Sequence, residues 1–216
     1  MAKKVNETNP VKQLSTALSE MMTELFGECK EVDGNLRSIV DNLGVVNGNA
    51  IVEVGLEGGI REEAPYGVLH FHTTLAENIP EEAVADLILS LNGLNHVINA
   101  GAYPAFGSFV YYYPLSQVYL SYRMPVNLNQ IEADYDNIRY YLGVLYDQLD
   151  LLMDFIMFTI ADPGAMTIGD YMEYLDEVSD LDSLEERFKA LEGTMREMAA
   201  DMGIDYDNVE TEEDDE

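Results

Sequence analysis

Cysteine, basic residues and long apolar runs are scarce in this sequence. The single cysteine, Cys29, excludes an intramolecular disulfide, and an unpaired thiol fits a reducing compartment better than secretion. The N-terminus is polar and has no apolar stretch of signal-peptide length. No uncharged apolar run approaches the roughly 18 residues that a membrane-spanning helix needs. We therefore expect a soluble protein of the cytoplasm that does not enter a membrane.

The shortage of basic residues makes charge the one extreme property of the chain. Lys and Arg total 11 against 41 Asp and Glu, which gives a formal net charge of −30. Such a surface repels nucleic-acid phosphate and anionic lipid and attracts basic partners. The 216 residues, of which 47% are hydrophobic, have the composition of a globular domain with an appendage.

Motifs of common enzyme classes are also missing. The sequence has no P-loop, no dinucleotide-binding fingerprint and no Gly-x-Ser-x-Gly elbow. No sequence near Cys29 suggests a catalytic base for a thiol nucleophile. We therefore predict a protein that is not an enzyme, with no catalytic residue, no cofactor and no metal.

The spacing of apolar residues predicts alternating blocks of helix and strand. Apolar residues recur at helical spacing in four segments and alternate with polar ones in others. The predicted helices cover 11–25, 36–43, 81–98 and 131–160, and the predicted strands cover 50–56, 67–75, 106–113 and 118–124. The last two strands are joined by a short turn and form an antiparallel hairpin.

These elements predict an α+β fold, with helices packed on a twisted antiparallel sheet in the order α-β-β-α-β-β-α. We expect a flexible arm over 1–10 and the α+β domain over 11–164. A helical extension over 165–204 begins with a capping box formed by Thr167 and Asp170. Residues 205–216 are nearly all acidic or polar, which predicts a disordered tail.

One stretch resembles a known family. It contains Leu87-Ile-Leu-Ser-Leu-Asn-Gly-Leu-Asn95, then Gly101 and Phe106-Gly-Ser-Phe109, and then Val118-Tyr-Leu-Ser-Tyr-Arg123. The pattern resembles the YbjN-like family, which shares the fold of type III secretion chaperones, and the match spans residues 11–160. The resemblance implies helices around an antiparallel sheet, a protein client and a homodimer. This chain departs from the family by its longer extension from Ala165 onward.

Two predicted strands carry the side chains that we single out as a partner-binding surface. His70 and His72 share one face of a strand, and Tyr119 and Arg123 share one face of another. If the two strands are neighbours, the four side chains form one outer patch of residue types common at protein interfaces. The two histidines have a spacing that can also bind a metal, with Glu53 as a third ligand. Our prediction is a face turned to solvent or to a client.

The last predicted helix offers a second candidate surface. Met195 and Met198 lie on it, and methionine side chains adapt to variable partners. The alternative is that this helix packs back on the domain. Either way, the sequence favours a chaperone-like or regulatory domain that binds a basic protein client.

A DNA mimic is the alternative function. Asp147, Asp150 and Asp154 form a stripe on the long helix, opposite its apolar face, which predicts a solvated acidic surface. Together with the acidic tail, such a stripe would let the protein occupy a nucleic-acid-binding partner through charge. Salt separates the two functions, because a charge-based complex weakens as ionic strength rises.

Overall fold

The computed structural model describes residues 9–57, 66–101 and 105–178, together with the single positions Lys189, Gly193 and Arg196. Within these residues the chain forms one six-stranded antiparallel sheet and four α-helices. The strands are β1 (Cys29–Val32), β2 (Asn35–Leu43), β3 (Gly48–Glu57), β4 (Tyr66–Glu77), β5 (Ser108–Tyr112) and β6 (Gln117–Asn127). The helices are α1 (Pro10–Phe26), α2 (Val84–Asn99), α3 (Tyr135–Ala161) and α4 (Ile168–Val178). The predicted α+β class is confirmed.

The sheet has its longest strands at the centre and its shortest at the edges. Its order is β1-β2-β3-β4-β6-β5, and every neighbouring pair is antiparallel. The edge strands β1 and β5 have only four and five residues. Short edges limit unwanted pairing with other chains.

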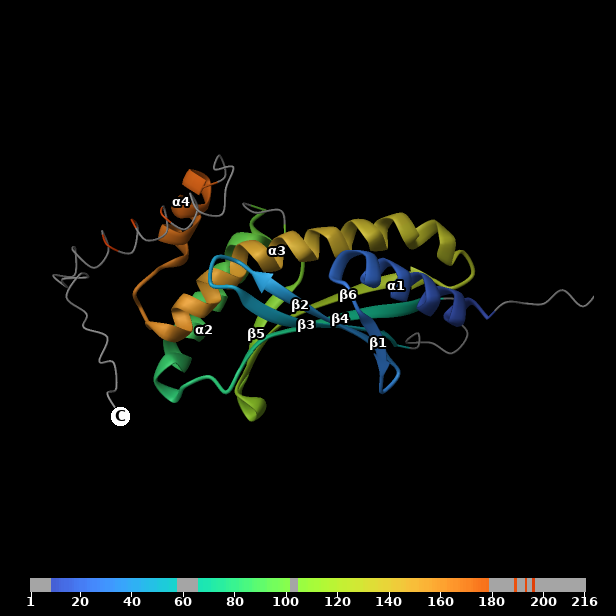
Figure 1. Cartoon of the computed structure of the whole chain (residues 1–216), viewed down its shortest axis with the longest axis horizontal. Helices are drawn as coiled ribbons and strands as arrows, with labels where there is room; N and C mark the ends of the chain where they lie inside the picture. The colour runs from blue at the N-terminus through green and yellow to red at the C-terminus, as the bar shows by residue number, and fades with distance from the viewer. Residues whose placement is uncertain are drawn as a thin grey trace, which may run out of the picture.

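Three helices pack on one side of this sheet. Figure 1 shows α1 and α3 lying along the same side of the strands, with α2 behind the end of α3. The core fills the space between the layers, because alternate strand residues and one face of each helix point into it. Fully buried members include Leu69, Phe71, Leu87, Leu120, Leu142 and Phe155. The opposite side of the sheet is left without a helix among the described residues.

Local signals set the ends of the helices. The side chain of Asn9 accepts a hydrogen bond from the Val11 backbone N–H, Pro10 occupies the first turn, and Gly27 ends α1 at φ +85°. At the start of α4, the Thr167 backbone N–H donates to Asp170 and the Asp170 N–H donates to the Thr167 hydroxyl. This reciprocal pair is the predicted capping box.

The predicted helix over 36–43 is wrong, because these residues form β2. Leu36, Ser38 and Val40 alternate into the core, while Ile39 lies on the opposite face with 57% of its surface exposed. A register shift between Val40 and Leu43 then changes the phase, so that Leu43 is buried again. The bulge thus reproduces the apolar spacing of a helix. As a result, four strands stand between α1 and α2 where the predicted order had two.

The predicted solvated stripe on the long helix is wrong at two of its three residues, Asp150 and Asp154, while Asp147 is exposed as predicted. Asp154 is only 3% exposed, and its carboxylate accepts hydrogen bonds from the backbone N–H groups of Val45 at 3.0 Å and Val46 at 2.9 Å. Asp150 accepts a third, from Gly44 N at 2.9 Å. The two carboxylates hold the turn between β2 and β3 against α3. Gly44 has φ +65°, and a Cβ there would collide with Asp154 Oδ1.

Several predictions fall outside the described residues. These are residues 1–8 of the arm predicted over 1–10, the last predicted helix with Met195 and Met198, and the tail over 205–216. The arm is predicted too long, because Asn9 caps α1 and Pro10 begins it. Among the helices that the structure describes, none combines the length and the hydrophobicity that crossing a membrane requires.

Candidate binding face of the sheet

The face of the sheet that points away from the helices gathers the four strand residues predicted from the sequence. β4 and β6 are hydrogen-bonded neighbours, and their register sets His70 opposite Arg123 and His72 opposite Ser121. The rings of His72 and Tyr119 lie with their centroids 4.4 Å apart. We call this side of β2–β6 the open face.

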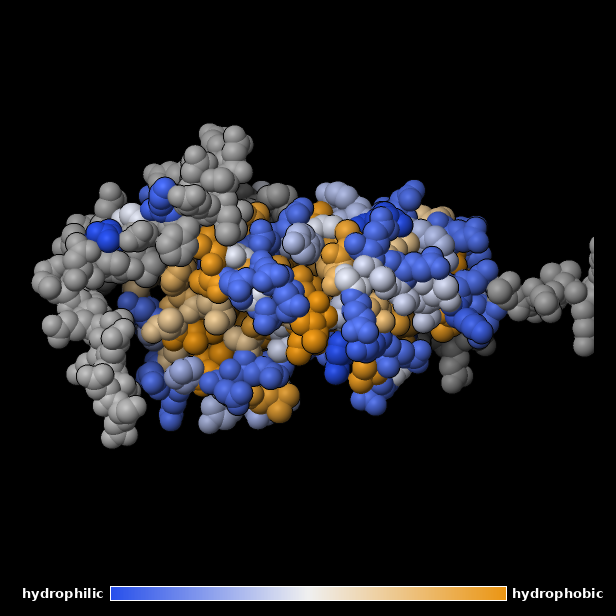
Figure 2. Space-filling view, viewed as in Figure 1, coloured by the Kyte–Doolittle hydropathy of each residue, from blue (hydrophilic) through white to orange (hydrophobic). Residues whose placement is uncertain are grey.

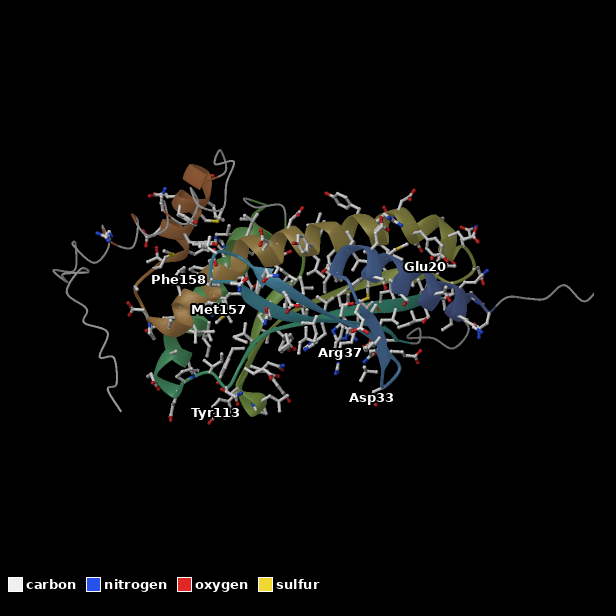
Figure 3. All side chains as sticks on the ribbon, in the orientation of Figure 1. Glu20, Asp33, Arg37, Tyr113, Met157 and Phe158 are labelled. Carbon is white, nitrogen blue, oxygen red and sulfur yellow. The ribbon has the colours of Figure 1, made fainter. Side chains whose placement is uncertain are left out.

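The open face is only partly shielded within the described part of the chain. Figure 2 shows an indentation in the outline beneath the sheet, and Figure 3 shows Arg37 on that side, away from α1 and α3. The side chains of Arg37 and Arg123 are 40% and 59% exposed. Among residues 9–57, 66–101 and 105–178, none closes this face to a partner that approaches from the side opposite the helix layer.

A polar row crosses the open face through paired charges. Arg37 donates from Nε at 3.0 Å and from Nη2 at 2.7 Å, both to Oε1 of Glu53. Arg123 donates to Oε2 of Glu57, and Oε1 of Glu57 lies 3.6 Å from His70 Nδ1. These pairs place positive and negative groups side by side, so the row is nearly neutral although the protein as a whole is strongly acidic.

A small hollow lies in this row, above Gly55 of β3. Because successive residues of a strand alternate between faces, Glu53, Gly55 and Glu57 all face the open side, and the glycine leaves room between the two carboxylates for the side chain of Asn35. The hollow has a volume of about 260 Å³. Its polar lining consists of Asn35, Glu53, Glu57, His70 and His72.

An apolar row runs beside the polar one. In the register of the sheet, Ile39 lies opposite Ile51, and Tyr119 lies opposite Val110. Across β2, β3, β4, β6 and β5 the row reads Ile39, Ile51, Thr74, Tyr119 and Val110; Thr74 is its one polar member, buried and hydrogen-bonded to Gln117. A partner that covered the open face would thus bury apolar surface next to hydrogen-bonding groups, the usual composition of a protein interface.

His72 joins the two rows and stays neutral near pH 7. Burial lowers the pKa of this imidazole; the nearby Glu53 carboxylate opposes that shift, and His70 adds to it. A neutral imidazole has one nitrogen that donates and one that accepts a hydrogen bond. His72 can therefore offer an acceptor to a ligand in the hollow.

A metal site at these histidines finds no support in the geometry. Within the described residues, no group of three or more His, Cys, Asp and Glu side chains is placed to hold a metal ion. The third histidine, His96, lies on α2, and Cys29 begins β1. The arrangement suits binding through hydrogen bonds and charge.

The edge of the sheet at β5 is closed by a side chain of α2. Asn95 Nδ2 donates to the Phe109 carbonyl at 2.8 Å, and the Phe109 N–H donates to Asn95 Oδ1 at 2.8 Å. These are the two bonds that a further strand would make at this residue. Binding by strand addition at Phe109 would require Asn95 to leave.

A second hollow lies between α1 and the first strands. Its volume is about 220 Å³, and apolar side chains from both layers dominate its lining. They are Val11, Leu14, Leu18, Leu36, Val54 and Leu56, with Glu31 at β1. This helix groove is on the other side of the sheet from the open face.

Sequence reasoning missed the half of the site that comes from β2 and β3. Arg37 and Ile39 were placed on a helix, so their alternation with Leu36, Ser38 and Val40 was not used. That period of two is the signal that would have found them. The glycine between Glu53 and Glu57 is visible in the sequence, but its role requires the neighbouring strands.

Comparisons with protein-family models, with curated proteins and with solved structures find no match to this chain. The resemblance of residues 11–160 to the YbjN-like family, and the binding role of the residues named above, stay predictions.

Proposed function

We propose that this protein is a non-enzymatic binding domain that holds a segment of a basic protein client against the open face of its sheet. The observation that carries the proposal is the row from Ile39 to Val110 beside paired charged groups, in which Ile39 is 57% exposed and Ile51, Tyr119 and Val110 are partly exposed. Burying apolar area supplies affinity, and the neighbouring polar groups fix orientation and exclude wrong partners.

The residue types of the face support a protein partner. Tyr and Arg dominate the energetics of many interfaces, because they give a large contact area with a polar end. Tyr119 and Arg123 both lie on this face, which also carries Ile39 and Ile51 on β2 and β3. The net charge of −30 favours a basic client through long-range attraction.

The DNA-mimic alternative loses part of its basis. It rested on an acidic stripe along α3, and of that stripe Asp150 and Asp154 are engaged by the β2–β3 turn. Of the three aspartates only Asp147 is exposed. The geometry therefore favours a face that reads shape and hydrogen bonds over one that presents a continuous row of charge.

Capture from native lysate at low and at high salt tests the proposal. The tagged wild type is compared with Tyr119→Ala and Ile39→Asp on the open face, and Tyr140→Ala is the matched control, since Tyr140 is 66% exposed on α3. We expect a client that is retained at high salt, lost by both open-face variants and kept by the control. Circular dichroism checks that each variant is folded.

Two results would count against the proposal. One is a client whose capture is equally strong with Tyr119→Ala, Ile39→Asp and wild type, which would move binding to another surface such as the helix groove. The other is capture at low salt alone, of nucleic-acid-binding proteins, with no effect of either variant. That outcome would favour the DNA mimic.

A further inference from the structure

The side chains that line the hollow above Gly55 favour a positively charged ligand. Glu53 and Glu57 flank it along β3, while Arg37 and Arg123 lie beyond them on β2 and β6. Each carboxylate is therefore paired with one arginine and also borders the hollow. A positive group in the hollow would lie beside two carboxylates, whereas an anion would be repelled by both.

The hydrogen-bonding groups around the hollow point to the same class of ligand. Both hydrogen bonds of Arg37 end on Oε1 of Glu53, which leaves Oε2 for a ligand within the described part of the chain. Asn35 Oδ1 reaches over Gly55, since a Cβ at that glycine would collide with it. The neutral imidazole of His72 adds a further acceptor. Acceptors that converge in this way match an ammonium or guanidinium group, which carries only donors.

An apolar group is a poor occupant of the same space. It would take the two carboxylates out of water without replacing their hydrogen bonds. The volume of about 260 Å³ suits the end of one side chain and is too small for a folded element. The adjacent apolar row would hold the rest of the bound segment.

We propose that the hollow above Gly55 is a pocket for the charged end of one lysine or arginine side chain of the client. This inference rests on the proposed function, because it assigns the recognition chemistry of the same face. The pocket would place the recognition of a basic client at one position on the open face, where the carboxylates of Glu53 and Glu57 bind its charged group.

Titration with two small probes tests the pocket directly on the full-length protein. N-acetyl-arginine amide carries the guanidinium, and N-acetyl-citrulline amide has the same shape without the charge. The ring signals of His70 and His72 are followed by NMR at low salt and pH 7.5, and His96 on α2 serves as an internal control. We expect saturable shifts of the first two signals with the arginine probe, no shift of the third, and a citrulline response at least fivefold weaker.

Variants of the pocket sharpen the test. Gly55→Ala places a methyl group where the Asn35 Oδ1 acceptor lies, and Glu53→Gln keeps the shape of the hollow while removing one charge. Both should weaken the arginine probe, the second by about two- to fivefold, as expected for one partly exposed ion pair. If Gly55→Ala does not fold, Glu53→Gln still decides the matter. Tyr140→Ala is expected to bind the probe as the wild type does.

The pocket proposal is overturned if arginine and citrulline shift the histidine signals equally, or if the arginine probe shifts all three histidines alike. It is also overturned if Glu53→Gln binds the arginine probe as tightly as the wild type. Its failure is distinguishable from failure of the client-binding function. If capture of a client depends on Tyr119 but the arginine probe does not bind, only the pocket proposal is rejected. If the probe binds but no client depends on Tyr119, the client-binding function is rejected.

Discussion

The contact between α3 and the β2–β3 turn gives the most direct test of the architecture. Asp154 is 3% exposed and accepts hydrogen bonds from Val45 N at 3.0 Å and Val46 N at 2.9 Å. Replacing it with alanine removes both acceptors and leaves two backbone donors without them. The turn links the two strands that supply half of the open face, so its loss should loosen that face as well.

The expected magnitude follows from the number and kind of bonds. A hydrogen bond to a charged group contributes about 1.5–3 kcal/mol. Because Val45 and Val46 are themselves only half-buried, the lower value applies to each bond, and Asp154→Ala should lower the free energy of unfolding by about 3 kcal/mol. At about 2–4 °C per kcal/mol for a protein of this size, the Tm should fall by about 6–12 °C.

Asp147→Ala is the matched control, since Asp147 lies exposed on the same helix. Both substitutions raise helix propensity equally, so the difference between them isolates the buried bonds. Thermal and urea unfolding followed by circular dichroism give the two stabilities. Hydrogen exchange at Val45 and Val46 shows whether the turn has been released. If the Asp154→Ala and Asp147→Ala proteins unfold within about 1 °C of each other, the carboxylate does not hold the turn and the reasoning fails.

Two further predictions concern the sheet. Asn95→Ala should lower the free energy of unfolding by about 1–3 kcal/mol and speed hydrogen exchange of the Phe109 amide, because both backbone groups of Phe109 lose their partner. Asn92 is exposed on the same helix, and Asn92→Ala should change neither quantity. Equal effects of the two substitutions would contradict the role of Asn95 in closing the sheet edge. The lowered pKa of His72 predicts that stability falls as pH drops below the ordinary value of 6.5, because the unfolded chain then binds a proton that the folded protein resists. The groups that surround the His72 ring are Glu53, His70 and Tyr119. His72→Gln should reduce the loss of unfolding free energy between pH 7.5 and 5.5. If the loss is the same in the variant and the wild type, His72 is not its source.

The central strands were predictable because their alternation holds over most of their length, although the register of β4 shifts after Thr74. β3, β4 and β6 each place apolar residues on one face, and the short link before β6 fixes it against β5. That information brought His70, His72, Tyr119 and Arg123 to one side of the sheet before the strand order was known.

The rest depended on contacts that periodicity does not encode. The bulge in β2 gives Leu36, Val40 and Leu43 the spacing of a helix, so two strands and the side chain of Arg37 were lost from the predicted sheet. Similarly, the pattern along α3 shows which side Asp154 occupies, but not that a turn over a hundred residues earlier lies against it. Both errors concern long-range neighbours, and only the three-dimensional structure supplies those.

The distribution of charge connects the fold to the proposed function. The chain carries 41 acidic and 11 basic residues, yet on the open face Arg37 and Arg123 each neutralise a glutamate. A uniformly acidic face would attract any cation and fix none of them, because exposed charges at high dielectric give weak and poorly oriented contacts. With the arginines in place, long-range attraction comes from the whole protein, while short-range selection falls to the hollow between Glu53 and Glu57. A basic partner would thus be drawn in by net charge and held in one orientation by a locally balanced surface.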